Sequence, residues 1–283
     1  MKPYKYWTVA LRKKDGEWFR PDKSKSGIQA DPFLVSYNGK TYLFYEKADP
    51  ITLKGYLVCM DIDKKRPKVI LKESFHLSYP FVFMIGKEWY MIPESKQNHC
   101  IMLYKAKQFP WKWEPYRKLL DADAVDTTCL EREGTWYFYT YVNGTLHIYT
   151  ALLDENGIPL HLKKICEQQP SKRKRPGGKF FYHDGKLLRP AQICEHFYGE
   201  ALVFCTQNWT KENQVVEMED KELHAGDISI KEKHLHPIGI HTYNRSEEYE
   251  VVDLYCEQRG IAALIKKTLY IPLQILYERD KKK

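Results

Sequence analysis

Short apolar runs alternate with polar turns along the chain, and one arrangement of them recurs five times. In the first copy, a strand-like run at 30–35 is followed by an Asn-Gly turn at 38–39 and a second run at 41–46. Asn-Gly and Asp-Gly pairs predict hairpins because these residues tolerate positive φ. A further strand-like run follows each hairpin, at 55–60, 101–106, 146–152, 201–206 and 262–265.

The first four copies are evenly spaced, and the fifth follows after a longer interval. They start near residues 30, 78, 125, 175 and 239, and the motif residues Asp31, Tyr79, Asp126 and Arg175 follow one another at 48, 47 and 49 residues. His241 follows after a longer interval of 66 residues. A period of about 40–50 residues with several strands in each is typical of propeller blades. We therefore predict an all-β fold: a five-bladed β-propeller with about four antiparallel strands per blade, formed by residues 1–283 as a single domain.

Three segments fall outside the repeat. The strand-like run at 6–11 precedes the first copy, and we expect it to supply the outer strand of the last blade, which closes the ring and removes open edges. The polar segment 208–236 is expected to form an extended hairpin or loop. Segment 269–277 is compatible with a strand or a short helix, and Pro272 argues against a long helix.

Charge narrows the range of partners only slightly. The net charge is +8, which favours anionic partners such as nucleotide-sugars, phosphorylated glycans or a membrane surface. Nucleic acid is a less favoured partner, because the basic residues do not alternate with aromatics in any recognisable module. No run of about 20 apolar residues is present, so we predict no membrane span.

The cysteines indicate a compartment. Seven are present, no CxxC pair occurs, and most lie in apolar strand-like runs, so we predict free buried thiols in a reducing cytosol and a cytoplasmic location. The N-terminus has no apolar segment typical of a signal peptide. The Gly177-Gly178 pair lacks the strand and helix context of a dinucleotide site. We expect neither a metal site nor a cofactor.

A propeller brings equivalent residues of its blades together. The innermost strand of each blade lines the central channel, so the first motif residues should surround one mouth of a funnel. These residues are Asp31, Tyr79, Asp126, Arg175 and His241. A purely structural repeat would keep one residue type at such a position, so their diversity indicates a binding site, although some central residues only hold trapped water.

Other polar residues are expected to form a second layer around the funnel. They close the second strands of blades one, two and four or follow them: Glu46, Glu94, Arg189, Gln192, Tyr198 and Glu200. Two carboxylates within about 5–10 Å would allow hydrolysis of a glycoside. An arginine beside them can instead clamp a phosphate or a uronate. Alternatively, the arginines and carboxylates form structural ion pairs across the channel.

The motifs resemble those of known carbohydrate-related propellers. Residues 30–33 and 39–46 resemble the first blade of family 43 glycoside hydrolases, in which the Asp of this motif is the general base. The chain is more similar to the propeller at the N-terminus of glucosamine inositolphosphorylceramide transferases, and to propellers beside formyltransferase-like domains in bacterial glycan clusters. The residues that carry this resemblance are 76–83, 91–95, 175–178, 188–192, 198–200 and 239–242.

Two alternative functions follow. In the first, an enzyme acts on a glycan or nucleotide-sugar in surface-polysaccharide or glycolipid assembly. Asp31 would be the base, as the resemblance implies, or a carboxylate that orients the sugar. Our own hypothesis makes Glu94 or Glu200 the acid, and Arg175, Arg189 and His241 would hold an anionic group. In the second, a non-catalytic propeller binds a sugar and presents it to a separate transferase. Only Asp31 matches the hydrolase pattern cleanly, because Tyr79 occupies the second-blade position and Asp126 and Arg175 occupy the next two.

Overall fold

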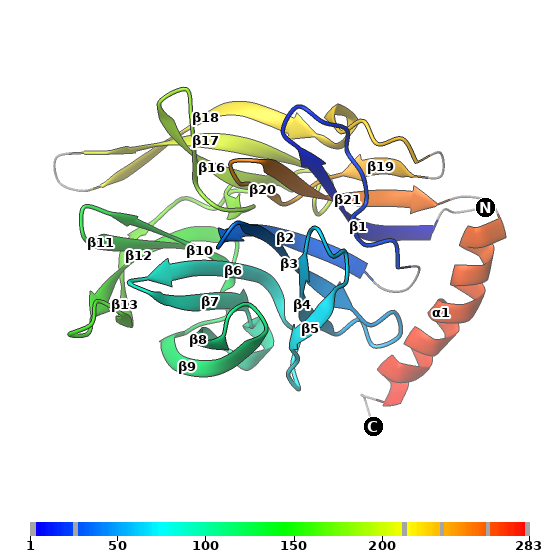
Figure 1. Ribbon diagram of the computed structural model, residues 1–283, viewed down its shortest axis with the longest axis horizontal. Coiled ribbons are helices and arrows are strands. Elements are labelled where there is room, and N and C mark those ends of the chain that lie inside the picture. Colours follow the sequence, from blue (N-terminus) through cyan, green and yellow to red (C-terminus); the bar gives the residue numbers. More distant parts are fainter. Residues whose placement is uncertain (1–3, 25–27, 211–213, 233–234, 259–260, 281–283) are drawn as a thin grey trace.

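The computed structural model describes residues 4–24, 28–210, 214–232, 235–258 and 261–280, and within the last segment it describes the side chains of 263–272. The strands form five antiparallel sheets arranged as the blades of a β-propeller (Figure 1). Successive sheets follow the predicted repeats, so the five-bladed all-β fold is confirmed.

The first three blades have four strands each, which run in chain order from the axis outward. Blade one contains β2 (Ile28–Tyr37), β3 (Lys40–Ala48), β4 (Gly55–Asp61) and β5 (Lys68–Leu71). Blade two contains β6 (Ser78–Ile85), β7 (Glu88–Glu94), β8 (Cys100–Gln108) and β9 (Lys112–Asp121), with the 3-10 helix η1 (Lys96–Asn98) after β7. Blade three contains β10 (Val125–Arg132), β11 (Thr135–Val142), β12 (Thr145–Leu153) and β13 (Pro159–Glu167).

In the last two blades the innermost strand is interrupted. Blade four contains β14 (Arg175–Pro176) and β15 (Phe181–His183), then β16 (Lys186–Ile193), β17 (Ala201–Trp209) and β18 (Val215–His224). Blade five contains β19 (His236–Gly239), β20 (Tyr243–Arg245), β21 (Tyr249–Gln258) and β1 (Tyr4–Lys13). Strand β1 pairs with the outer side of β21, so the N-terminal strand closes the ring as predicted.

The segment after Asn208 forms a hairpin. Strand β18 pairs with β17 over most of its length and is the outer strand of blade four, as the prediction of an extended hairpin required. The 3-10 helix η2 (Ala225–Asp227) follows it.

The C-terminal segment differs from the prediction. Helix α1 (Ile261–Asp280) is continuous and contains Pro272, so the predicted strand at 262–265 and the argument against a long helix were both wrong. The residues before Pro272 include the good helix formers alanine, leucine and lysine, and an interior proline can bend a helix without ending it. The helix lies beside β1 at the edge of the propeller (Figure 1). No helix within the described part of the chain is long and apolar enough to cross a membrane.

A backbone irregularity recurs at the start of the innermost strands. Asp31, Tyr79 and Asp126 have φ of 51°, 45° and 52°, and each lies at a β-bulge in β2, β6 or β10. A non-glycine residue with positive φ is strained, and a bulge re-aims its side chain. The same irregularity in three blades turns three equivalent side chains toward the propeller axis, where the candidate site lies.

Candidate functional site

Asp31 lies at the bulge of β2 and is held from three sides. Its Oδ1 accepts a hydrogen bond from the Thr242 hydroxyl at 3.0 Å, and its Oδ2 accepts one from the backbone N–H of Tyr79 at 3.1 Å. Its own N–H donates to Asp253 Oδ2 at 2.9 Å. These contacts join blades one, two and five, so Asp31 is oriented before any ligand arrives.

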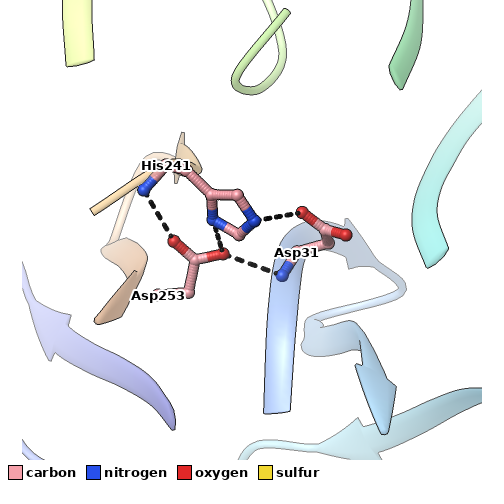
Figure 2. Close-up of side chains that lie close together, drawn as sticks. All are labelled: Asp31, His241 and Asp253. Atoms are coloured by element: carbon pink, nitrogen blue, oxygen red, sulfur yellow. Dashed lines mark hydrogen bonds and ion pairs between the residues drawn. The ribbon is translucent and has the colours of Figure 1, made fainter. Parts of the chain in front are cut away.

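His241 lies between two carboxylates (Figure 2). Its Nδ1 is 2.6 Å from Asp253 Oδ2, and its Nε2 is 3.5 Å from Asp31 Oδ1. Burial alone would lower the pKa of His241, but the neighbouring charge of Asp253, its hydrogen bond and the charge of Asp31 raise it. The imidazole therefore tends to carry a proton on both nitrogens and to act as a cation between the two carboxylates.

These three residues are also the only group among the described residues that could hold a metal, because their ligand atoms lie within 4.8 Å of one another. Asp253 already accepts the backbone N–H groups of Asp31, His241 and Thr242. Nδ1 of His241 also faces Asp253, so the oxygens of Asp253 have little capacity left to coordinate a metal ion. A proton shared between His241 and Asp253 fits this arrangement better than a metal ion does.

A second group of charges lies across the funnel. Arg175 Nε donates to Asp126 Oδ2 at 2.5 Å, and Arg175 Nη2 is 3.8 Å from Glu94 Oε2. The Gln192 amide also donates to Asp126 Oδ2, at 2.7 Å, and the Ser78 hydroxyl donates to Glu94 at 3.1 Å. The predicted residues Asp126, Arg175, Gln192 and Glu94 thus form one connected network.

Glu46 completes the acidic lining. Its Oε1 is 3.4 Å from His76 Nε2. His76 Nδ1 accepts the N–H of Gly55 at 2.9 Å, and burial lowers the pKa of His76. The imidazole is therefore neutral with its proton on Nε2, and it donates toward Glu46 without supplying a positive charge.

Crowding of buried carboxyl groups perturbs their protonation. Burial, followed by the charge of Asp126, raises the pKa of Glu94 to about 8, although Arg175 opposes the shift. Burial likewise raises the pKa of Asp31 to about 6, with His241 opposing it. Burial and the charges of Asp31, Glu94, Asp253 and Asp126 raise the pKa of Glu46 well above its usual range. At neutral pH Glu94 therefore holds a proton beside an ionised Asp31, and ionisation of Glu46 is disfavoured.

Aromatic rings form the rim. Tyr198 is 47% exposed, and its ring lies 5.1 Å from the Arg175 guanidinium and edge-on to Trp7 and His241. The Trp7 ring stacks on the His241 imidazole at 4.0 Å between centroids. This close approach requires Gly199, because a Cβ there would lie 2.4 Å from the Trp7 ring. A half-exposed ring above charged groups suits stacking against a sugar face.

The structure gives Tyr79 a different role from the predicted ligand contact. The residue is fully buried. Its hydroxyl lies 2.7 Å from Thr128 Oγ1 and accepts the N–H of Gly178 at 2.8 Å, and its ring packs edge-on against Phe33. Tyr79 therefore forms the floor of the funnel and joins blades two, three and four, which leaves no free face for a ligand.

Two further predicted site residues have their partners elsewhere. Arg189 is completely buried and forms an ion pair with Glu217 at 2.6 Å within blade four, which matches the structural alternative. Glu200 accepts hydrogen bonds from the N–H of His196 at 3.0 Å and lies 2.7 Å from its Nδ1. The backbone hydrogen bond lowers the pKa of Glu200. An ionised carboxylate cannot donate a proton, so Glu200 is unsuited to act as the acid.

The sequence reasoning missed two members of the site, Asp253 and Trp7. Asp253 stands alone as a charge within the apolar run 251–254, and a buried charge of this kind signals specific partners. Trp7 lies in the N-terminal strand, and only ring closure brings it beside His241.

The fold also occurs in carbohydrate-cleaving enzymes. The catalytic domain of the GH62 α-L-arabinofuranosidase from Coprinopsis cinerea superposes with a TM-score of 0.59 at 12% identity, covering 90% of this chain and 97% of that one. An exo-β-1,3-galactanase from Clostridium thermocellum superposes with a TM-score of 0.52 at 11% identity, covering 77% and 57%. At such low identities the likeness establishes the fold alone.

Sequence comparison identifies the family. Glucosamine inositolphosphorylceramide transferase 1 of Arabidopsis thaliana is 34% identical over 191 residues, 62% of this chain and 25% of that protein. Its counterpart in Oryza sativa subsp. japonica is 30% identical over 202 residues, 66% of this chain and 27% of that protein. The chain thus spans about a quarter of the length of these curated relatives. The family model "Glucosamine inositolphosphorylceramide transferase 1, N-terminal" matches residues 20–253, so the chain belongs to this carbohydrate-related family.

Proposed function

We propose that the funnel binds the amino-sugar part of a glycan or nucleotide-sugar used in glycolipid assembly, and that the chain presents it to a separate transferase. The observation that carries this proposal is the charge of the funnel. The charges of Asp31, Glu94, Asp126 and Asp253 all disfavour ionisation of Glu46. Among the described residues of the funnel only Arg175 and His241 offer compensating positive charge.

A cationic ligand would relieve this imbalance. Burial and the charges of Asp31 and Asp126 disfavour ionisation of Glu46 and Glu94, and Glu94 holds a proton at neutral pH. An ammonium group within a few ångströms favours the ionised form of a carboxyl group. We therefore expect an amino sugar to bind with release of about one proton, and a neutral sugar to bind more weakly.

The rim supports a sugar as the ligand. Tyr198 supplies a half-exposed ring, and Arg175, whose side chain is 22% exposed, presents donors beside it. The names of the curated relatives include glucosamine, which is an amino sugar. We propose the same class of ligand for this chain. The cytoplasmic location indicated by the free thiols stays a prediction.

Calorimetry tests the proposal directly. Glucosamine and glucose would be titrated into the protein at pH 7 in two buffers with different ionisation enthalpies, which reveals the proton release. We expect glucosamine to bind at least about tenfold more tightly, because a charge-assisted hydrogen bond contributes about 1.5–3 kcal/mol. Asp31→Asn should weaken glucosamine binding and leave the weak glucose affinity nearly unchanged.

A matched control lies on the same strand as Glu94. Glu88 begins β7, and its exposed carboxylate pairs only with Lys105 at 3.5 Å among the described contacts. Glu88→Gln should bind glucosamine like the wild type, whereas Glu94→Gln should bind it more weakly and release fewer protons. Equal affinities for the two sugars, or binding without proton release, would contradict the proposal.

One observation favours hydrolysis as a second candidate. Glu94 holds a proton at neutral pH and its side chain is 14% exposed, as a general acid in a glycosidase requires. Asp31 would then be the base, although each of its oxygens already accepts a hydrogen bond. Release of the aryl group from nitrophenyl glycosides by the wild type, abolished in Glu94→Gln and Asp31→Asn, would establish this alternative.

A further inference from the structure

The channel has a second opening, opposite the funnel. A pocket of about 580 Å³ is lined by residues from all five blades. In blades one to three, the strands β2, β6 and β10 carry both sets of residues. The residues that line this pocket lie several positions after Asp31, Tyr79 and Asp126 on these strands, so the pocket lies at the other end of the channel. We call this the lower pocket. Its aromatic walls comprise Phe81, Phe83, Trp89, Trp136 and Phe180.

The lower pocket is separate from the funnel. Tyr79 and its hydrogen bonds to Thr128 and Gly178 lie between the two openings, and Phe33 packs edge-on against both Tyr79 and Phe81. A ligand in the lower pocket would therefore not touch Asp31 or Glu94. Binding in the lower pocket is therefore independent of sugar binding in the funnel.

One amine stands among the aromatic walls. Lys179 has its backbone N–H fixed by Asn244 Oδ1 at 2.7 Å, and its Nζ lies 5.7 Å from the centre of the Phe81 ring. Its one hydrogen bond among the described residues is a long one, 3.4 Å to the carbonyl of Leu34. None of the described carboxylates lies within 4.0 Å of it. Burial lowers the pKa of this amine to about 8.

The other charged groups of the pocket do not neutralise Lys179. Glu131 accepts the N–H of Gly134 in its own hairpin at 2.6 Å, and the Arg245 guanidinium lies over the Phe181 ring. Glu247 also lines the pocket, and the buried Cys129 thiol has its pKa raised by burial. A half-buried ammonium with unused donors remains, and an anion is the partner that would satisfy it.

We propose that the lower pocket is a binding site for an apolar molecule that carries one anionic group, with the anion on Lys179 and the apolar part against Phe81, Phe83 and Trp136. A carboxylate and a phosphate head group share this chemistry. The aromatic walls accommodate either rings or an acyl chain.

Two fluorescent probes of matched shape test this site. 8-Anilinonaphthalene-1-sulfonate carries an anionic group, and N-phenyl-1-naphthylamine has the same rings without it. We expect the anionic probe to bind one site on the intact chain. Lys179→Met should weaken it about tenfold or more, because a charge-assisted hydrogen bond is lost, and should leave the neutral probe within twofold. Lys179→Arg should retain the anionic probe.

Controls separate this site from other apolar surfaces. Lys87 is exposed in the turn between β6 and β7, so Lys87→Met removes a lysine outside the pocket and should leave both probes unaffected. Trp136→Ala should weaken both probes. Competition with dodecanoate, dodecyl phosphate and dodecanol then distinguishes carboxylate from phosphate. Unchanged affinity of the anionic probe in Lys179→Met, or of both probes in Trp136→Ala, would overturn the proposal.

Discussion

Removal of Arg189 tests the structural role that the fold gives it. Its side chain and that of Glu217 are 0% and 1% exposed, and its Nε and Nη2 donate to Glu217 at 2.6 and 3.1 Å. Arg189→Met would leave a buried carboxylate with Lys174 Nζ at 3.6 Å and the Gln207 amide at 2.7 Å as remaining partners. Breaking one side of a buried pair costs about 3–5 kcal/mol. Because these two partners of Glu217 remain, we expect a loss of stability near the lower end of this range, about 3 kcal/mol.

The pKa of Glu217 gives an independent magnitude. Burial raises it, but Arg189 and Lys174 lower it to about 2 from an ordinary 4.5. A depressed carboxyl pKa of this size stabilises the folded state by about 3 kcal/mol, since each pH unit corresponds to about 1.4 kcal/mol. Because the folded pKa is the lower one, this stabilisation is present above pH 4.5 and is lost as the pH falls toward 2.

Urea unfolding at pH 7 measures the effect. We expect Arg189→Met to lower the free energy of unfolding by about 3 kcal/mol, and Arg189→Met combined with Glu217→Gln to recover at least half of that loss, because no buried charge then remains. The difference between wild type and Arg189→Met should shrink as the pH falls from 4.5. A loss under about 1 kcal/mol, or a double variant no more stable than the single one, would refute this reasoning.

Three further outcomes follow from the geometry. Gly178→Ala should unfold the protein or lower the free energy of unfolding by more than about 4 kcal/mol. The reason is that its Cβ would lie 1.9 Å from the Tyr243 carbonyl oxygen, at a φ of 146°. Gly144→Ala has open space around its Cβ and should lower the free energy of urea unfolding by about 1 kcal/mol. Tyr79→Phe should lower the free energy of unfolding by about 1–3 kcal/mol in the same assay. It should leave glucosamine affinity unchanged, because the Tyr79 hydroxyl bonds only Thr128 and Gly178 among the described residues. Altered affinity would contradict the role of Tyr79 as the floor of the funnel. A thiol reagent should modify Cys166 and Cys194 before the five buried cysteines, and mass spectrometry that finds a buried cysteine modified first would count against the described packing.

The repeat pattern alone was enough to predict the blades. Alternating apolar positions and Gly-containing turns act locally, so the hairpin at 38–39 and its counterparts could be predicted without knowledge of their neighbours. Near-equal spacing of the first four copies, with a fifth after a longer interval, implied equivalent positions around one axis for Asp31, Asp126, Arg175 and His241. The C-terminal helix departs from the prediction because an interior proline such as Pro272 can bend a helix without ending it.

Only the tertiary structure could assign roles to these residues. Tyr79 and Asp31 occupy equivalent bulges, yet one forms the floor and the other carries a carboxylate of raised pKa, because side-chain size and cross-blade partners differ. Arg189 and Arg175 look alike in sequence, but their partners Glu217 and Asp126 come from different strands. The protonation of these groups depends on burial and on charges that the fold brings together from different blades. The distances between those charges cannot be read from the positions of the residues along the chain.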